Sequence, residues 1–110
     1  MDLNSFCRVF HGNLCCLGPL IESKAMKFVD DLIMDAADEG AKILQGGEKF
    51  DHPVSNLIYE PTLLTNVTQD MRIFKEEIFG PIVPLVRFRN ETEALELANK
   101  TSFGLASYFY

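Results

Sequence analysis

The sequence has no excess of positive charge and no long apolar run. It carries 10 basic against 16 acidic residues, a formal net charge of -6. Sequence-independent binding to nucleic acid or to an anionic membrane depends on Lys and Arg, so we expect no nucleic-acid partner and no membrane association. No apolar stretch approaches the ~20 residues that span a bilayer. With 47% hydrophobic and 24% charged residues in a chain of 110, the composition is that of a globular domain.

Cysteine is scarce and is not distributed for disulfide bonds. The three cysteines, Cys7, Cys15 and Cys16, all lie within the first 16 residues. This pattern favours a reducing compartment. The segment 1–17 also lacks the charged start and the uninterrupted apolar stretch of a secretory signal, and a single arginine is little for a mitochondrial transit peptide. We therefore expect an intracellular protein, cytoplasmic or mitochondrial.

Motifs for metal ions and phosphates are also missing. His11 and His52 are far apart, and no C-x-x-C or H-x-x-x-H spacing occurs, so no metal site is predicted. There is no G-x-x-x-x-G-K-[ST] loop and no G-x-G-x-x-G fingerprint. A Cys–His pair made from Cys15 or Cys16 with His52 would depend entirely on the fold.

A long amphipathic helix is predicted over residues 21–39. Seven apolar residues recur at the spacing of one helix face: Ile21, Ala25, Phe28, Val29, Leu32, Ile33 and Ala36. Gly40 stands where a left-handed C-terminal cap would end the helix.

Shorter elements follow in an α/β alternation. We expect strands near 41–44, 62–67, 82–88 and 105–110, with 48–56 as a loop and Pro61 dividing the run 57–67. A short helix within 69–77 should turn Ile73 and Phe74 inward, and Asn90 with Glu93 forms a capping-box-like start for a last helix. The prediction is an α/β fold with a partial parallel sheet and packed helices.

The segment 75–84, KEEIFGPIVP, is the best candidate site. It joins a predicted helix to a predicted strand, a junction where α/β proteins often place ligand-contacting groups. Glu76 and Glu77 are neighbours that cannot share one helix face, so one can point into a cleft while the other is solvated. A carboxylate suits a vicinal diol such as a ribose edge, and Phe79 could contact a flat ring. An ordinary helix end with a buried Phe79 is the alternative interpretation.

Several segments in order resemble one enzyme family. They are GPLI (18–21), GAK (40–42), GG (46–47), YEPTLL (59–64), EEIFGP (76–81), ANKT (98–101) and FGLA (103–106). Together they are similar to the NAD(P)-dependent aldehyde dehydrogenase superfamily, and the resemblance covers residues 18–110. The segments NVTQDM (66–71) and YFY (108–110) favour the succinate-semialdehyde dehydrogenase branch.

The resemblance implies a chemistry and two site residues. In the family, a cysteine thiolate attacks the aldehyde, hydride passes to the nicotinamide of NAD or NADP, and a glutamate activates water. The second glutamate of EEIFGP holds the nicotinamide ribose, which corresponds to Glu77, and the phenylalanine borders the nicotinamide, which corresponds to Phe79. Glu76 inherits no role and should be solvated or in an ion pair. The parent enzyme is expected to act on a small-molecule aldehyde as a homo-oligomer.

The departures from the family limit what this chain should do alone. The nucleophile, the water-activating glutamate, the oxyanion-hole asparagine and the dinucleotide fold all precede GPLI in the family. Residues 1–17 do not resemble that segment, and Cys15 and Cys16 lie too close to GPLI to be the nucleophile. We therefore expect an unmatched segment 1–17, either foreign or a mispredicted start, joined to an internal slice, 18–110, of an aldehyde dehydrogenase catalytic domain, with no catalytic residue assigned.

Overall fold

Helix α2 (Ser23–Asp38) supplies one side of the core, as its apolar spacing predicts. The computed structural model describes residues 17–53, 55–104, 106–108 and 110. The buried residues of α2 recur on one face: Met26, Val29, Leu32, Ile33 and Ala36. Ile21 was predicted on this face, but it is 96% exposed. The reason is that Glu22 is the N-cap residue, so Ile21 precedes the helix.

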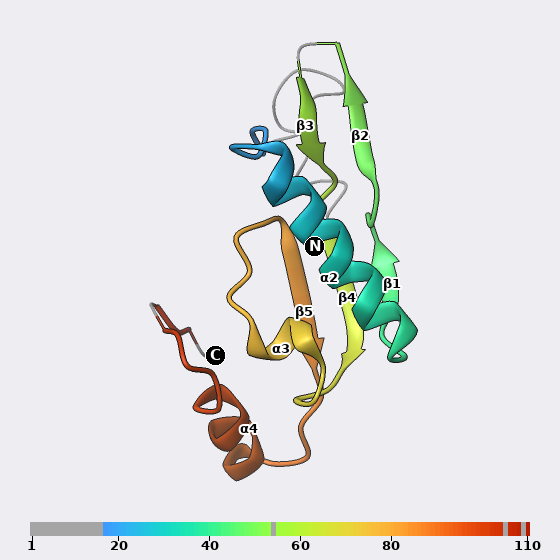
Figure 1. Ribbon diagram of the computed structural model, residues 1–110. Helices are drawn as coiled ribbons and strands as arrows, with labels where there is room; N and C mark the ends of the chain where they lie inside the picture. The colour runs from blue at the N-terminus through green and yellow to red at the C-terminus, as the bar shows by residue number, and fades with distance from the viewer. Residues whose placement is uncertain (1–16, 54, 105, 109) are drawn as a thin grey trace.

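A three-stranded sheet forms the second layer (Figure 1). Its strands are β1 (Lys42–Gln45), β4 (Thr62–Val67) and β5 (Ile82–Val86). The central strand β4 pairs antiparallel with β1 and parallel with β5. The short helix α3 (Arg72–Lys75) lies in the connection between the parallel strands. The predicted α/β fold with a partly parallel sheet is thus confirmed, and strands occur where 41–44, 62–67 and 82–88 indicate them.

The two helices α2 and α3 cover the same face of this sheet (Figure 1). Leu64 of β4, Ile73 of α3 and Leu32 of α2 meet in one buried cluster, and each is 2% exposed or less. Ile73 and the half-buried Phe74 point inward, as predicted. Burying large aliphatic side chains contributes about 1.5–3 kcal/mol each, so this cluster fixes α3 and the junction that follows it against α2.

The segment 48–56, predicted as a loop, instead forms most of an antiparallel hairpin. Its strands are β2 (Lys49–His52) and β3 (Ser55–Tyr59), which pair Phe50 with Ile58. The prediction was wrong because it relied on apolar content. A hairpin satisfies its backbone groups by pairing across the strands, and side chains on its solvated face can be polar.

The C-terminal part also differs from expectation. Helix α4 (Glu91–Ala98) begins as predicted, since the Asn90 side chain accepts a hydrogen bond from the Glu93 N–H at 2.9 Å. The Glu93 carboxylate, however, accepts from the Arg89 N–H at 2.7 Å rather than from Asn90. The final strand was wrong: residues 106–108 and 110 have no regular structure, and 105 and 109 lie outside the described residues. A strand needs a backbone partner, and no described strand pairs with this segment.

A buried tyrosine joins α2 to the hairpin. The Tyr59 hydroxyl lies 2.7 Å from Asp30 Oδ1 and 2.9 Å from the Gly47 carbonyl oxygen, and it is the donor to both. Lys49 Nζ lies 2.5 Å from Asp30 Oδ2. Burial and the hydrogen bond to Asp30 raise the pKa of Tyr59. Burial acts to raise the pKa of Asp30, but hydrogen bonds from Lys49 and Tyr59 outweigh it and hold that pKa below its usual value.

We expect Tyr59→Phe to lower the free energy of unfolding by about 1–3 kcal/mol at neutral pH, because the variant leaves Asp30 and Gly47 short of a donor. The wild type should lose stability above about pH 10, where the unfolded tyrosine ionises and the folded one does not. It should also lose stability below about pH 4, as the Asp30 carboxylate protonates. Urea unfolding of both proteins from pH 3 to 11 checks this. The prediction would be contradicted if the free energy of unfolding of the wild type and of Tyr59→Phe changed with pH in the same way at both the acidic and the alkaline end.

Candidate functional site

The junction between α3 and β5 is held tightly against α2. A Cβ placed on Gly80 would lie 2.4 Å from Cγ2 of Val29, so only glycine allows this approach. After it, the Pro81 carbonyl accepts a hydrogen bond from the Thr62 N–H at 2.8 Å, which ties the junction to the first residue of β4. The backbone on the C-terminal side of Phe79 is therefore fixed between the helix and the sheet.

Burial alternates along the EEIF part of the junction. Glu76 and Ile78 are half-buried, whereas Glu77 and Phe79 are exposed, Phe79 by 74%. Glu76 has extended backbone angles, φ -95° and ψ 142°. In extended backbone, successive side chains point to opposite sides, so Glu77 and Phe79 share the outer side of this segment. The buried phenylalanine considered as the alternative is not what the structure contains.

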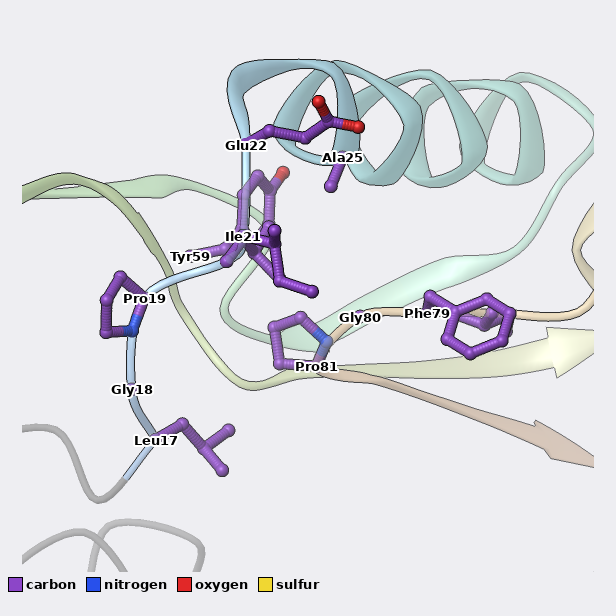
Figure 2. A pocket seen from close by; sticks show the side chains of 12 residues that line it. Leu17, Gly18, Pro19, Ile21, Glu22, Ala25, Tyr59, Phe79, Gly80 and Pro81 are labelled. Carbon is purple, nitrogen blue, oxygen red and sulfur yellow. The ribbon is translucent and has the colours of Figure 1, made fainter.

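Phe79 borders a groove of about 680 Å³. One wall is the segment 78–81, and the other is the segment 17–22 with Ala25 at the start of α2 (Figure 2). Glu77 is not among the residues that line this groove. The structure thus places Phe79 in the wall of the groove. Glu77 lies two residues earlier in the chain, on the same outer side of the segment but outside the groove.

The two adjacent glutamates have different surroundings. Arg72 Nε lies 2.5 Å from Glu76 Oε1, and Arg72 Nη2 lies 3.3 Å from Oε2, so Glu76 is in an ion pair as predicted. The hydrogen bond from Arg72 lowers the pKa of Glu76. The Glu77 carboxylate makes no hydrogen bond or ion pair with any residue that the structure describes. It is therefore an unused pair of acceptors on the surface.

By their chemistry, Glu77 and Phe79 can together contact a sugar diol and a flat ring. The carboxylate can accept two hydrogen bonds from neighbouring ribose hydroxyls, and the exposed ring offers a flat apolar surface. In extended backbone, two residues that lie two positions apart are separated by about 6.6 Å on the same side.

The second wall of the groove is a feature that sequence reasoning missed. GPLI (18–21) carries part of the family resemblance, and in the structure Leu17, Pro19 and Ile21 line the groove opposite Phe79. The Leu20 N–H donates to the Leu57 carbonyl at 2.7 Å, which fixes this wall on β3. The local sequence signal was the Gly18-Pro19 break before the helix, which indicates a turn but not what lies opposite.

Other site types are limited to what the described residues show. Within residues 17–53, 55–104, 106–108 and 110, no group of three or more His, Cys, Asp or Glu side chains is placed to hold a metal ion. In the same part of the chain, no helix is both long and apolar enough to cross a membrane. Cys7, Cys15, Cys16 and His11 lie outside the described residues, as does the side chain of His52.

Comparison with known proteins identifies the family of this fold. The aldehyde dehydrogenase family profile matches residues 11–110, and the chain belongs to that family. Over 93 residues, 84% of the chain, it is 48% identical to 3-sulfolactaldehyde dehydrogenase of Pseudomonas putida. It is 46% identical over the same length to the mitochondrial succinate-semialdehyde dehydrogenase of Homo sapiens. These matches cover 19% and 17% of the two relatives, so the chain spans about a fifth of their length.

Solved structures agree with the sequence relatives. Succinate-semialdehyde dehydrogenase from Burkholderia pseudomallei matches with a TM-score of 0.74 and 45% identity, over 84% of this chain and 19% of that one. Betaine aldehyde dehydrogenase from Staphylococcus aureus, solved in complex with NAD+, matches with a TM-score of 0.75 and 38% identity, over 83% and 18%. The predicted resemblance, including its semialdehyde dehydrogenase branch, is confirmed.

Proposed function

We propose that this chain is part of an oxidoreductase that oxidises an aldehyde, with succinic semialdehyde favoured, to a carboxylic acid with NAD or NADP. The observation that carries the proposal is the outward pair Glu77 and Phe79 beside the groove. The family assignment and the semialdehyde dehydrogenases among its relatives support the reaction class.

In this proposal the chain's own residues bind and orient the cofactor. Glu77 accepts hydrogen bonds from the nicotinamide ribose, and Phe79 lies against the nicotinamide ring. The nicotinamide, when bound, accepts the hydride from the substrate. A fixed ring position matters because hydride transfer needs the reacting atoms about 3–3.5 Å apart. The rigid backbone around Gly80 supports that position, since it holds the segment against Val29.

The alternative is a catalytically inactive truncated or pseudo-enzyme fragment with at most an association role. It is favoured because the family nucleophile is a cysteine well before GPLI, and Cys15 and Cys16 lie too close to GPLI to correspond to it. The enzyme proposal has three further parts. Residues 18–110 are part of a catalytic domain, the protein is intracellular, and the parent enzyme is a homo-oligomer. An upstream reading frame that encodes the cysteine motif would decide for the truncated enzyme.

We expect Glu77→Gln to weaken binding of NAD+ to the 110-residue chain by about three- to tenfold, because a charged acceptor facing the ribose becomes neutral. A titration followed by amide NMR shifts at millimolar NAD+ measures this. Glu96→Gln, an exposed carboxylate in α4, is the control for the lost charge. The same change at the aligned glutamate of a full-length relative should slow hydride transfer. Equal affinity and equal turnover in both proteins would overturn the role of Glu77.

A further inference from the structure

Arg72 and Glu76 form an ion pair directly beside Glu77, the proposed cofactor contact, and three hydrogen bonds join the two residues. Arg72 holds Glu76 at both carboxylate oxygens, and the Glu76 N–H donates to the Arg72 carbonyl oxygen at 2.9 Å. Main chain and side chain of Glu76 are thus fixed to one residue four positions earlier. Both side chains are about 40% exposed, so the pair adds little to global stability.

The direction in which the chain leaves α3 is fixed by this pair. That helix has only four residues and no side-chain N-cap, so its last turn depends on contacts beyond the backbone. Glu76 is its C-cap, and the backbone there is already extended. Because side chains alternate along extended backbone, a Glu76 side chain held against Arg72 turns that of Glu77 to the opposite, outer side.

Other carboxylates also contribute to the electrostatic surroundings of Arg72. The hydrogen bond with Glu76 raises the pKa of Arg72, and the negative charges of Asp35 and Asp31 on α2 act in the same direction. Asp35 Oδ2 is shielded from solvent and has no hydrogen-bond partner among the described residues. Glu76 is therefore the carboxylate that Arg72 holds by hydrogen bonds, whereas the carboxylates of α2 act on it only through their charge. Without the pair, the Glu76 carboxylate has no hydrogen-bond partner among the described residues, and the extended backbone that carries Glu77 loses one of its constraints.

We propose that Arg72 is a positioning residue that, by clamping Glu76, aims the Glu77 carboxylate at the nicotinamide ribose. This rests on the proposed function, since it assigns Arg72 a part in the same site. Arg72 touches no cofactor itself. Its contribution is orientation of a neighbouring acceptor, and this predicts that a change at Arg72 alters affinity for the ribose without altering the fold.

Nicotinamide riboside is the probe that separates orientation from simple charge attraction. It carries the ribose and the ring but no phosphate, and its net charge is positive. Removing the positive charge of Arg72 should by Coulomb attraction alone strengthen its binding. If Arg72 instead orients Glu77, its removal should misplace the Glu77 carboxylate and weaken binding of nicotinamide riboside. The sign of the change therefore identifies the cause.

The experiment titrates the full 110-residue chain with nicotinamide riboside and follows the amide shifts of residues 76–80. We expect Arg72→Ala to raise the dissociation constant about three- to tenfold, while Arg72→Lys, which keeps one donor, recovers part of the loss. Lys75→Ala is the matched control, because it removes a positive charge from the same helix. The Lys75 ammonium donates to the Asp70 carbonyl rather than to Glu76, so its loss should not weaken binding. Urea unfolding midpoints of all three variants should match that of the wild type.

If Arg72→Ala lowers the unfolding midpoint, Arg72→Met replaces it, since this variant keeps the apolar part of the side chain and breaks the same pair; it should show the same loss. Unchanged or tighter binding in Arg72→Ala, with Glu77→Gln still weakened, would overturn the role of Arg72 and leave the proposed function standing. Shift changes that occur in the wild type only at residues distant from 76–80 would overturn the proposed site, and the role of Arg72 with it.

Discussion

Purified residues 1–110 are expected to show no reduction of NAD+ or NADP+ with succinic semialdehyde or with a simple aliphatic aldehyde. Covalent catalysis needs a nucleophile within attack distance of the carbonyl, together with a base and an oxyanion donor. The family resemblance matches none of these groups to a residue of this sequence. Each missing group removes orders of magnitude in rate, so the expected effect is complete loss relative to a full-length relative.

Cofactor binding by the chain should also be weak. Glu77 and Phe79 offer two contacts to one half of a dinucleotide, whereas micromolar affinity needs about 8 kcal/mol. Absorbance of reduced cofactor over hours, with a full-length relative as the positive control, measures turnover. Product above blank that disappears when Cys15 and Cys16 are both changed to Ser would overturn the expectation and make one of those thiols a nucleophile.

The second large effect is expected at Gly46, where alanine should lower the free energy of unfolding by about 3–5 kcal/mol. Gly46 has φ +70°, and a Cβ there would lie 2.4 Å from the Pro61 carbonyl oxygen and 2.9 Å from Thr62 Oγ1. Thr62 Oγ1 accepts from the Gly47 N–H and donates to the Glu60 carbonyl, so it has little freedom to move. Such a loss is a large part of the ~5–15 kcal/mol that stabilises a typical domain.

Gly40→Ala is the matched control for this clash. Gly40 also has a positive φ, +105°, but a Cβ there would meet nothing within 4 Å. It should therefore cost only the backbone strain, about 1–2 kcal/mol. Thermal or urea unfolding of both variants measures the difference. If both variants lose the same free energy of unfolding, the backbone around Gly46 and Pro61 can shift to accommodate a Cβ at little cost, and the predicted clash is wrong.

Elements whose pattern lies within one segment could be predicted from the sequence. The helix Ser23–Asp38 follows from apolar residues at its own 3.6-residue spacing, and the start of Glu91–Ala98 follows from the Asn90 cap. The division of 57–67 follows from Pro61, because proline fixes its own φ and lacks an N–H. The prediction that Glu77 and Phe79 contact the cofactor likewise rests on a single segment, the EEIFGP hexapeptide, and stays a prediction.

Features that only the tertiary structure decided depend on contacts between distant segments. The hairpin β2–β3 was missed because pairing across strands, not apolar spacing, stabilises it. The groove exists because the wall fixed on Leu57 lies opposite Phe79, which is far along the chain from Gly18. The different states of Glu76 and Glu77 depend on a local contact, that of Arg72 with the residue four positions later, but only the structure shows that it forms. Two identical side chains differ only because Arg72 reaches one of them, and extended backbone turns the other away.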